Sequence, residues 1–498
     1  MKLPGKKYIL SIDQSTSGTK AVLFNRNAGF VARAQAEHRQ IYPKPGWVEH
    51  DPEEIFNNTL RVLAAVIQRA SIDKEDIACL SITNQRETVL AWDKNTGIPV
   101  YNAVVWQCMR GERQCNVLKD AGHESMIRKK TGLLIDPYFS ASGLSWILNS
   151  SQKIRQKTLK GDILAGTMDS WLIWKLTGGK SHMTDYTNAC RTLLFNIHSL
   201  KWDEQICRLF TVPVAILPQP MPADEIFGYT DAAGLFDAKI PISGVLGDSH
   251  GALFGQRCYH AGLSKVTYGT GSSVMLNIGK KAIGAPKGLV TSVGYGLKGN
   301  TDYVFEGNIH STGATIKWLI DTLQVISSAS ESEKLASSVD STNGVYFVPA
   351  FAGLGAPYWD NKAKATISGM TGGTTRAHIV RAGLESIAYQ VKDLLDLMAL
   401  KAGISLKEIR VDGGPTGNNF LMQFQADMLN APITISDVEE ASALGAALAG
   451  GLGTGMWKST GEIEKLYKSG ETKKPRMDSA TRNTLYSGWK KAVKQLLK

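Results

Sequence analysis

The sequence predicts an α/β protein built from two related domains. Its 498 residues are too many for one ordinary core, so two domains of roughly 250 residues each are expected. Short apolar strands alternate with amphipathic helices in both halves, which is typical of α/β sheets. A strand–turn–strand unit with a tip rich in Gly, Ser and Thr occurs once in each half, at 8–24 and 265–276. This repetition indicates two halves of similar architecture, with domains at 1–253 and 254–498.

The first half opens with a predicted β-hairpin followed by a helix. Residues 8–12 and 21–24 are apolar, and the polar turn 13–19 between them carries no helix signal. A helix is expected at 52–70, because Asp51 can cap its N-terminus and a proline fits its first position. Apolar residues recur at helical spacing along this segment, so one of its faces is expected to be buried.

Two further strands of the first half end in charged residues. The apolar run 77–83 is followed shortly by Arg86 and Glu87, and the run 240–246 is followed by Asp248. Ligands bind at the carboxyl ends of strands in open α/β sheets, so these side chains are candidates for a binding site. Asp248 also precedes a segment of small residues that reads as a helix, so it could instead be a helix N-cap.

The second half repeats the hairpin and adds long helices. Helices are expected at 376–402, at 418–429 and at 441–453, where the last is rich in Ala and Gly and suited to close packing. A strand at 409–412 ends in a pair of glycines. The two hydroxyl-rich tips and this glycine turn can supply backbone N–H groups to a polyphosphate, although each alone could be a simple tight turn.

Composition narrows the class of function. Lys and Arg outnumber Asp and Glu by 56 to 45, and the net charge of +11 suits an anionic ligand such as a nucleotide. There is no nucleic-acid motif, so no nucleic-acid partner is expected. No stretch is apolar enough for a membrane span, and the run 8–12 is too short for a signal-peptide core. Six cysteines without metal spacing are typical of reduced thiols, so a cytoplasmic protein is expected.

Several long motifs resemble one family. They include 42–52 (YPKPGWVEHDP), 83–88 (TNQRET), 344–359 (GVYFVPAFAGLGAPYW) and 410–414 (RVDGG). Together they closely resemble the glycerol kinases of the FGGY carbohydrate kinase family, and the resemblance covers nearly the whole chain. It implies the actin-like ATPase fold, in which two ribonuclease-H-like domains enclose a central cleft that closes on the substrate.

The resemblance also implies the ligands and the residues that bind them. ATP and Mg²⁺ are the expected cofactors, a small polyol is the expected substrate, and a homo-oligomer (dimer or tetramer) is expected. Asp248 is placed as the catalytic base, and Asp13 as the carboxylate associated with Mg²⁺; from the residues alone, Asp13 could equally form an Asx turn. The implied polyol-binding residues are Arg86, Glu87, Trp106, Tyr138, Asp248, Ser249 and Ser273. The implied nucleotide-binding residues are Thr16, Ser17, Lys20, Thr270, Gly313, Lys317, Gly414 and Asn418.

Two departures from the family pattern leave the substrate open. Ser249 stands where the family usually has Gln, and Ser273 stands where glycerol kinases typically have Phe. Both changes make the predicted pocket wider and more polar. The substrate is therefore glycerol or a larger acceptor, such as a tetritol, a pentitol or a short ketose. A non-catalytic actin-like ATP switch or filament subunit is the alternative from another class, although a switch needs no polyol pocket.

Overall fold

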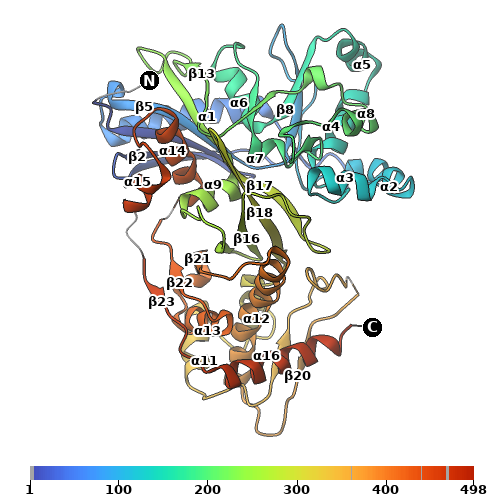
Figure 1. The fold of residues 1–498 in the computed structure, drawn as a ribbon, viewed down its shortest axis with the longest axis vertical. Helices are drawn as coiled ribbons and strands as arrows, with labels where there is room; N and C mark the ends of the chain where they lie inside the picture. The colour runs from blue at the N-terminus through green and yellow to red at the C-terminus, as the bar shows by residue number, and fades with distance from the viewer. Residues whose placement is uncertain (1–4, 361, 439, 467–469, 498) are drawn as a thin grey trace.

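The computed structural model describes residues 5–360, 362–438, 440–466 and 470–497. Its strands form two large mixed sheets, one in each half of the molecule, with helices packed against them (Figure 1). The prediction of a two-part α/β fold is therefore confirmed. In this described part of the chain, no helix combines the length and apolar character needed to cross a lipid bilayer.

The first large sheet has six strands in the order β13-β14-β5-β1-β2-β3. Strands β1, β2 and β3 are antiparallel neighbours, and β5 and β14 run parallel to β1. The strands are β1 (Tyr8–Gln14), β2 (Gly18–Asn25), β3 (Phe30–Glu37), β5 (Ile77–Asn84), β13 (Ile226–Thr230) and β14 (Ile240–Gly247).

The second large sheet has seven strands in the order β17-β18-β16-β15-β21-β22-β23. Strands β15, β16 and β18 are antiparallel neighbours, and β21 and β22 run parallel to β15. The strands are β15 (Leu263–Tyr268), β16 (Ser272–Gly279), β17 (Val290–Leu297), β18 (Asn300–Ile309), β21 (Glu408–Gly413), β22 (Ile433–Ile435) and β23 (Thr472–Lys473).

The two sheets share one topology. In each, three antiparallel strands are followed by two parallel ones, so the order β3-β2-β1-β5-β14 corresponds to β18-β16-β15-β21-β22. This is the internal repeat that the two Gly/Ser/Thr-rich hairpins predicted, and it agrees with two ribonuclease-H-like units. In both sheets, the polar segments selected in the sequence analysis follow the carboxyl ends of the parallel strands.

The predicted helices form at the predicted places. Helix α1 (Pro52–Ala70) begins after Asp51, whose carboxylate accepts hydrogen bonds from the backbone N–H groups of Glu53 and Glu54. Helix α12 (Arg376–Ala402) ends at Gly403 in the left-handed conformation. Helix α13 (Asn419–Leu429) is capped by Asn418, and α14 (Ala441–Gly453) has the predicted bounds.

Helix α14 returns to the first sheet, although it lies in the second half of the sequence (Figure 1). It packs against β1, β5, β14 and the short helix α9 (Asp248–Gly255). The contact with α9 needs glycine, because a Cβ atom on Gly445 would lie 1.8 Å from the carbonyl oxygen of Gly251. The Ala- and Gly-rich composition of α14 thus allows two helices to touch along their backbones.

The remaining elements cover the sheets and build the outer face of the first half. A four-stranded sheet has the order β4-β7-β6-β8. Its strands are β4 (Glu49–His50), β6 (Val89–Asp93), β7 (Ala103–Val104) and β8 (Ile163–Thr167). The other helices include α2 (Glu112–Asp120), α3 (Glu124–Thr131), α4 (Ser140–Asn149), α5 (Gln152–Leu159), α6 (Met168–Leu176), α7 (Tyr186–Ala189), α8 (Glu204–Leu209), α10 (Gly313–Asp321), α11 (Ala329–Ser337), α15 (Thr460–Lys465) and α16 (Ser479–Lys494).

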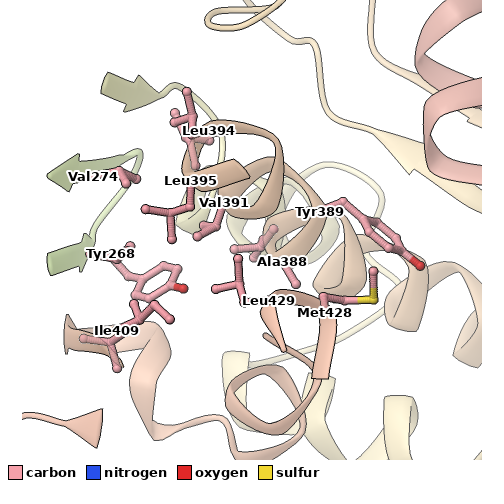
Figure 2. Close-up of a cluster of buried hydrophobic side chains, with 14 of the residues drawn as sticks. Tyr268, Val274, Ala388, Tyr389, Val391, Leu394, Leu395, Ile409, Met428 and Leu429 are labelled. Carbon is pink, nitrogen blue, oxygen red and sulfur yellow. The ribbon is translucent and has the colours of Figure 1, made fainter. Parts of the chain in front are cut away.

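The core of the second half lies between its sheet and helix α12. Figure 2 shows Val391, Leu394 and Leu395 of α12 in the same apolar cluster as Val274 and Ile409 from the sheet. All five side chains are fully buried. This packing fixes β15, β16 and β21, whose ends reach the candidate site.

Candidate functional site

Three neighbouring strands of the first sheet deliver charged residues to one edge. Strand β1 carries Asp13 next to its last residue, β5 is followed by Arg86 and Glu87, and β14 is followed directly by Asp248. These strands are parallel and adjacent in the order β1-β5-β14. Their carboxyl ends therefore meet, and the charged residues that the sequence singled out separately lie together.

Asp248 is the first residue of α9, and its carboxylate is free of a capping role. The residue at the N-cap is Gly247, and no side chain caps this helix. The alternative interpretation of Asp248 as an N-cap is therefore wrong, because the helix begins one residue earlier than that role requires. Its Oδ1 atom accepts a hydrogen bond from its neighbour Ser249 N at 2.5 Å and lies 3.0 Å from Arg86 Nε.

Arg86 and Glu87 occupy a strained turn and are held by buried charges. Glu87 has a φ of 64°, and Thr88 N donates to Arg86 O at 2.7 Å, which closes a three-residue turn. Arg86 Nη1 donates to both carboxylate oxygens of Glu306, at 3.0 and 3.1 Å. Arg191 Nε donates to Glu87 Oε1 at 2.5 Å. Within the described residues, Arg86 Nη2 and Glu87 Oε2 have no hydrogen-bond partner, which leaves the Nη2 amino group as a donor and Oε2 as an acceptor for a ligand.

Two aromatic rings form a wall beside this pair. The ring centroids of Trp106 and Tyr138 lie 5.5 Å apart at an interplanar angle of 66°. Trp106 Nε1 donates to Thr16 Oγ1 at 3.0 Å, so the wall is attached to the tip of the first hairpin. Burial, reinforced by the Glu87 carboxylate, raises the pKa of Tyr138 well above its ordinary value, so its hydroxyl stays protonated and can donate a hydrogen bond.

A cavity of about 540 Å³ lies between the two sheets beside Asp248, and we call it the cleft cavity. The predicted polyol residues Arg86, Glu87, Trp106 and Tyr138 are not among the residues that line it. Its walls come from the end of β1, from β2, β15 and β16, from the start of α9, from the end of β21 and the turn after it, and from the segment between β22 and the first turn of α14. Five of the predicted site residues line it, namely Asp13, Lys20, Asp248, Ser249 and Ser273. The sequence analysis did not select other lining residues, which include Lys265, Thr267, Asp412 and Glu440.

Polar atoms without partners point to a ligand in the cleft cavity. Thr267 and Ser273 are directly opposite each other on β15 and β16. Their hydroxyl oxygens and Asp412 Oδ1 are buried and have no hydrogen-bond partner among the described residues. Buried polar atoms are normally paired, so these three are candidates to bind a ligand or its water shell.

The carboxylates of the cleft cavity fit a hydrated divalent cation. Burial raises the pKa of Asp13 to about 7, an effect that Lys20 partly offsets, so a cation there would favour the ionised form. Among the described residues, no group of three His, Cys, Asp or Glu side chains is placed to enclose a metal. This donor set suits Mg²⁺, which is commonly held by one or two carboxylates, waters and phosphate oxygens.

Lys20 does not point freely into the cleft cavity. Its Nζ atom lies 2.9 Å from Glu440 Oε2, and Arg33 Nη1 lies 2.9 Å from the other oxygen of the same carboxylate. Glu440 precedes α14, so this ion pair ties the first hairpin to the helix that returns from the second half. Binding of a phosphate by Lys20 would require it to share its charge with Glu440.

A second cavity, of about 570 Å³, lies in the second half between α10, α11 and α13. It is lined by apolar side chains such as Ile316 and Leu421 and by polar groups such as Ser332. Asn418 Nδ2 donates to Ser332 Oγ at 3.3 Å across the cavity wall. Four predicted nucleotide-binding residues line it, namely Gly313, Lys317, Gly414 and Asn418.

The other predicted nucleotide residues lie at the two hairpin tips. Thr270 O accepts a hydrogen bond from Thr312 N at 3.1 Å, so the second tip sits against the start of α10. Ser17 is exposed at the first tip. Lys317, in contrast, is exposed and forms an ion pair with Asp321 in the next helical turn, with 2.6 Å between Nζ and Oδ2.

Sequence reasoning missed two charged residues beside the predicted polyol pair. Arg191 follows α7, and Glu306 lies on β18, more than two hundred positions after Arg86 in the chain. Arg191 Nη1 donates to Glu306 Oε2 at 2.8 Å. An Arg after a short helix and a Glu in a strand carry no local motif, so only the fold reveals them.

Comparison with known proteins identifies the family. The model of the FGGY family of carbohydrate kinases, N-terminal domain, matches residues 8–255, and the model of its C-terminal domain matches residues 264–454. A protein named glycerol kinase 2 from Thermotoga maritima is 50% identical over 491 residues, which cover 99% of both chains. A glycerol kinase from Caldanaerobacter subterraneus is also 50% identical, again over 99% of both chains.

A solved structure gives the same result for the fold. The crystal structure of Plasmodium falciparum glycerol kinase with ADP matches with a TM-score of 0.94 and 38% sequence identity. The match covers 99% of this chain and 98% of that one. Both family models together span most of the sequence, and they meet near the boundary between the two large sheets. The chain belongs to the FGGY family of carbohydrate kinases.

Proposed function

We propose that this protein transfers the γ-phosphoryl group of ATP to glycerol, giving glycerol 3-phosphate and ADP. The observation that carries the proposal is the position of Asp248. Its carboxylate lies beside Arg86, outside any helix cap, and lines the cleft cavity that also holds Asp13. The named relatives, which are glycerol kinases over almost their full length, support glycerol as the acceptor. Membership of a kinase family leaves no support for a non-catalytic switch.

The polyol binds beside the Arg86–Glu87 turn in this proposal. Arg86 Nη2 donates to one hydroxyl group and Glu87 Oε2 accepts from its neighbour, which matches the pattern of two vicinal hydroxyls. The wall of Trp106 and Tyr138 covers the carbon chain. The third hydroxyl then points toward Asp248 and the cleft cavity.

The chemical step needs a base and a way to spread negative charge. Asp248 accepts the proton of the terminal hydroxyl as its oxygen forms a bond to the γ-phosphorus, and the bond from that phosphorus to the β,γ-bridging oxygen breaks. Mg²⁺, when bound, neutralises the charge of the phosphate oxygens, and Asp13 would hold it through water. Closure of the two halves would exclude water, which competes with the polyol as acceptor.

The second cavity takes the adenine and ribose in this scheme. Ile316 and Leu421 offer apolar surface to the base, and Asn418 and Gly414 approach it from the turn after β21. The backbone N–H groups of the two hairpin tips, near Thr16 and Thr270, then surround the phosphates. The tips lie on opposite halves, so the nucleotide would bridge the two sheets.

A coupled assay tests the proposed function. Protein, ATP, Mg²⁺ and glycerol are mixed, ADP release is followed continuously, and glycerol 3-phosphate is identified by mass spectrometry. We expect ADP and glycerol 3-phosphate in equal amounts. ADP release that does not depend on glycerol, or its absence at millimolar glycerol, would overturn the proposal.

A larger polyol is the second candidate, and one observation favours it. Ser249 and Ser273 line the cavity that contains Asp248, and the hydroxyl of Ser273 is buried without a partner among the residues described. A four- or five-carbon polyol could satisfy that hydroxyl. Rates with glycerol, erythritol, ribitol and xylulose at matched concentrations decide between the two. The double variant Ser249→Gln with Ser273→Phe should shift kcat/KM toward glycerol by roughly 10-fold or more, because it restores apolar contact area.

The organisation of the molecule completes the proposal. We assign the polyol site to residues 1–253 and the main nucleotide contacts to 254–498, with α14 returning to support the first sheet. We further propose that the protein works in the cytoplasm as a homo-oligomer. Light scattering of the purified protein would determine whether this is a dimer or a tetramer.

A further inference from the structure

Glu306 and Arg191 join the proposed polyol pair in one buried network. Glu306 receives Arg86 Nη1 at 3.0 and 3.1 Å and Arg191 Nη1 at 2.8 Å. Arg191 also donates to Glu87 at 2.5 Å and to Ser292 Oγ at 2.9 Å. The chain of contacts therefore runs from Arg86 through Glu306 and Arg191 to Glu87.

The four side chains of the network are largely buried, which restricts their geometry. Arg86 is 7% exposed, Glu87 3%, Arg191 2% and Glu306 3%. Burial would raise the pKa of Glu306, but Arg191 and Arg86 outweigh it and lower this pKa to about 2. The carboxylate is thus charged at any working pH. A buried charge that loses its partner strongly destabilises the protein, so each side chain of the network is kept in contact with its ion-pair partners.

The network leaves free the two atoms that a polyol would need. Glu306 occupies Nη1 of Arg86, and Arg191 occupies Oε1 of Glu87. Within the described part of the chain, Arg86 Nη2 donates no hydrogen bond and Glu87 Oε2 accepts none. Without Glu306, the guanidinium of Arg86 could rotate toward Asp248, which already lies 3.0 Å from its Nε atom.

Glu306 also comes from the other half of the protein. It lies on β18, within the region that matches the C-terminal family model, whereas Arg86, Glu87 and Arg191 lie within the N-terminal match. Strand β18 pairs with β16, where Met275 is directly opposite Glu306 and Ser273 lies two residues earlier. The second sheet therefore reaches the site of the first through this carboxylate and through Ser292 of β17 (Val290–Leu297), which accepts a hydrogen bond from Arg191.

We propose that Glu306 is a positioning residue for the polyol. It orients Arg86 directly and Glu87 through Arg191, so that Nη2 and Oε2 face the two hydroxyl groups. The inference rests on the proposed function, since it takes the Arg86–Glu87 turn as the polyol site. Glu306 does not touch the substrate in this scheme, and the nucleotide cavity does not depend on it.

Steady-state kinetics of Glu306→Gln test the proposal. The variant keeps the shape of the side chain and removes the charge that both guanidinium groups share. We expect kcat/KM for glycerol to fall on the order of 10²-fold, mainly through KM, because a displacement of about 1 Å has effects of that size. The KM for ATP should change less than threefold. Glu306→Asp keeps the charge on a shorter arm and should recover part of the loss.

Glu385→Gln is the matched control. Glu385 is a buried glutamate (2% exposed) on α12 that accepts a hydrogen bond from Arg381 Nε at 2.9 Å. It makes a similar ion pair outside the polyol site. We expect it to lower the melting temperature while leaving the KM for glycerol within twofold of wild type.

Three results separate the possible failures. If Glu306→Gln and Glu306→Asp both keep wild-type KM for glycerol while Arg86→Ala raises it, the positioning role is wrong and the polyol site stands. If Arg86→Ala also leaves that KM unchanged, the proposed polyol site itself is wrong. If Glu306→Gln does not fold, Glu306→Asp carries the test, and an equal rise in the KM values for glycerol and ATP would overturn the proposal.

Discussion

Replacing Asp248 by asparagine removes the proposed base and leaves the fold almost untouched. The structure explains why the fold should tolerate this substitution. The side chain caps no helix, since Gly247 occupies the N-cap of α9, and it is 39% exposed. Arg86 loses a neighbour at Nε but keeps its two hydrogen bonds to Glu306.

The expected magnitudes are well separated. An ion pair with an exposed partner contributes about 0.2–1 kcal/mol, so the free energy of unfolding should fall by less than about 1 kcal/mol. Loss of a general base costs roughly 10²–10⁴-fold in rate. That loss corresponds to about 3–5 kcal/mol in the activation free energy. The effect on catalysis should therefore be several times larger than the effect on stability.

Three measurements on Asp248→Asn test the reasoning. Turnover is followed by ADP release, nucleotide affinity by calorimetric titration with ADP, and stability by urea denaturation. We expect turnover to collapse while the other two stay near wild type. Asp478→Ala is the control, because Asp478 does cap α16 and its loss should cost about 1 kcal/mol without changing turnover. Turnover of Asp248→Asn within threefold of wild type would refute the assignment of Asp248 as base.

Three further predictions concern stability and the link between the two ligand sites. Gly445→Ala should destabilise the protein by about 1–3 kcal/mol in urea, because its Cβ would lie 1.8 Å from the backbone of α9; Gly461→Ala, whose Cβ would meet nothing closer than 3.8 Å, should be neutral or slightly stabilising. Burial lowers the pKa of His50 to about 3, so this side chain binds a proton more tightly in the unfolded state than in the folded state. Its contribution to the free energy of unfolding is therefore present in full above pH 6.5 and should fall by about 2 kcal/mol at pH 5. A melting temperature that stays constant from pH 8 to pH 5 would contradict this. Trp106→Phe removes the hydrogen bond to Thr16 and should raise the KM for glycerol and for ATP about 2–10-fold, whereas an unchanged KM for ATP would show that the first hairpin tip does not depend on this wall.

Local chemistry explains why much of the fold could be predicted from the sequence. Helix α1 begins where Asp51 caps it, and α12 ends at a glycine in the left-handed conformation. Both signals act within one turn of the helix, so they are visible in the sequence. The repeated hairpins were also readable, because strand period and tip composition are local. The return of α14 to the first sheet was not, since no residue near it records which sheet it will cover.

The candidate site likewise has features that local sequence predicts and features that it does not. Residues at strand ends could be located because the strand itself predicts where its carboxyl end lies, as for Asp13 and Asp248. The role of Asp248 could not be decided, since a helix N-cap and a free carboxylate differ by one position in where the helix begins. The structure resolves this by placing Gly247 at the cap.

The turn at Glu87 shows what long-range contacts contribute to the site. A non-glycine residue with a φ of 64° is held against its own preference, at a cost of about 1–3 kcal/mol, so other interactions must maintain it. The structure supplies them from distant positions: Arg191 binds the Glu87 carboxylate, and Ser140 Oγ donates to the Glu87 carbonyl at 2.7 Å. The sequence around Arg191 or Ser140 contains no motif that predicts a contact with Glu87. The backbone of the proposed polyol site is therefore set by residues that bind no polyol in this scheme. A substitution at Ser140 should alter polyol affinity, whereas one at Arg191 should also destabilise the fold, because it leaves the buried Glu87 carboxylate without its partner.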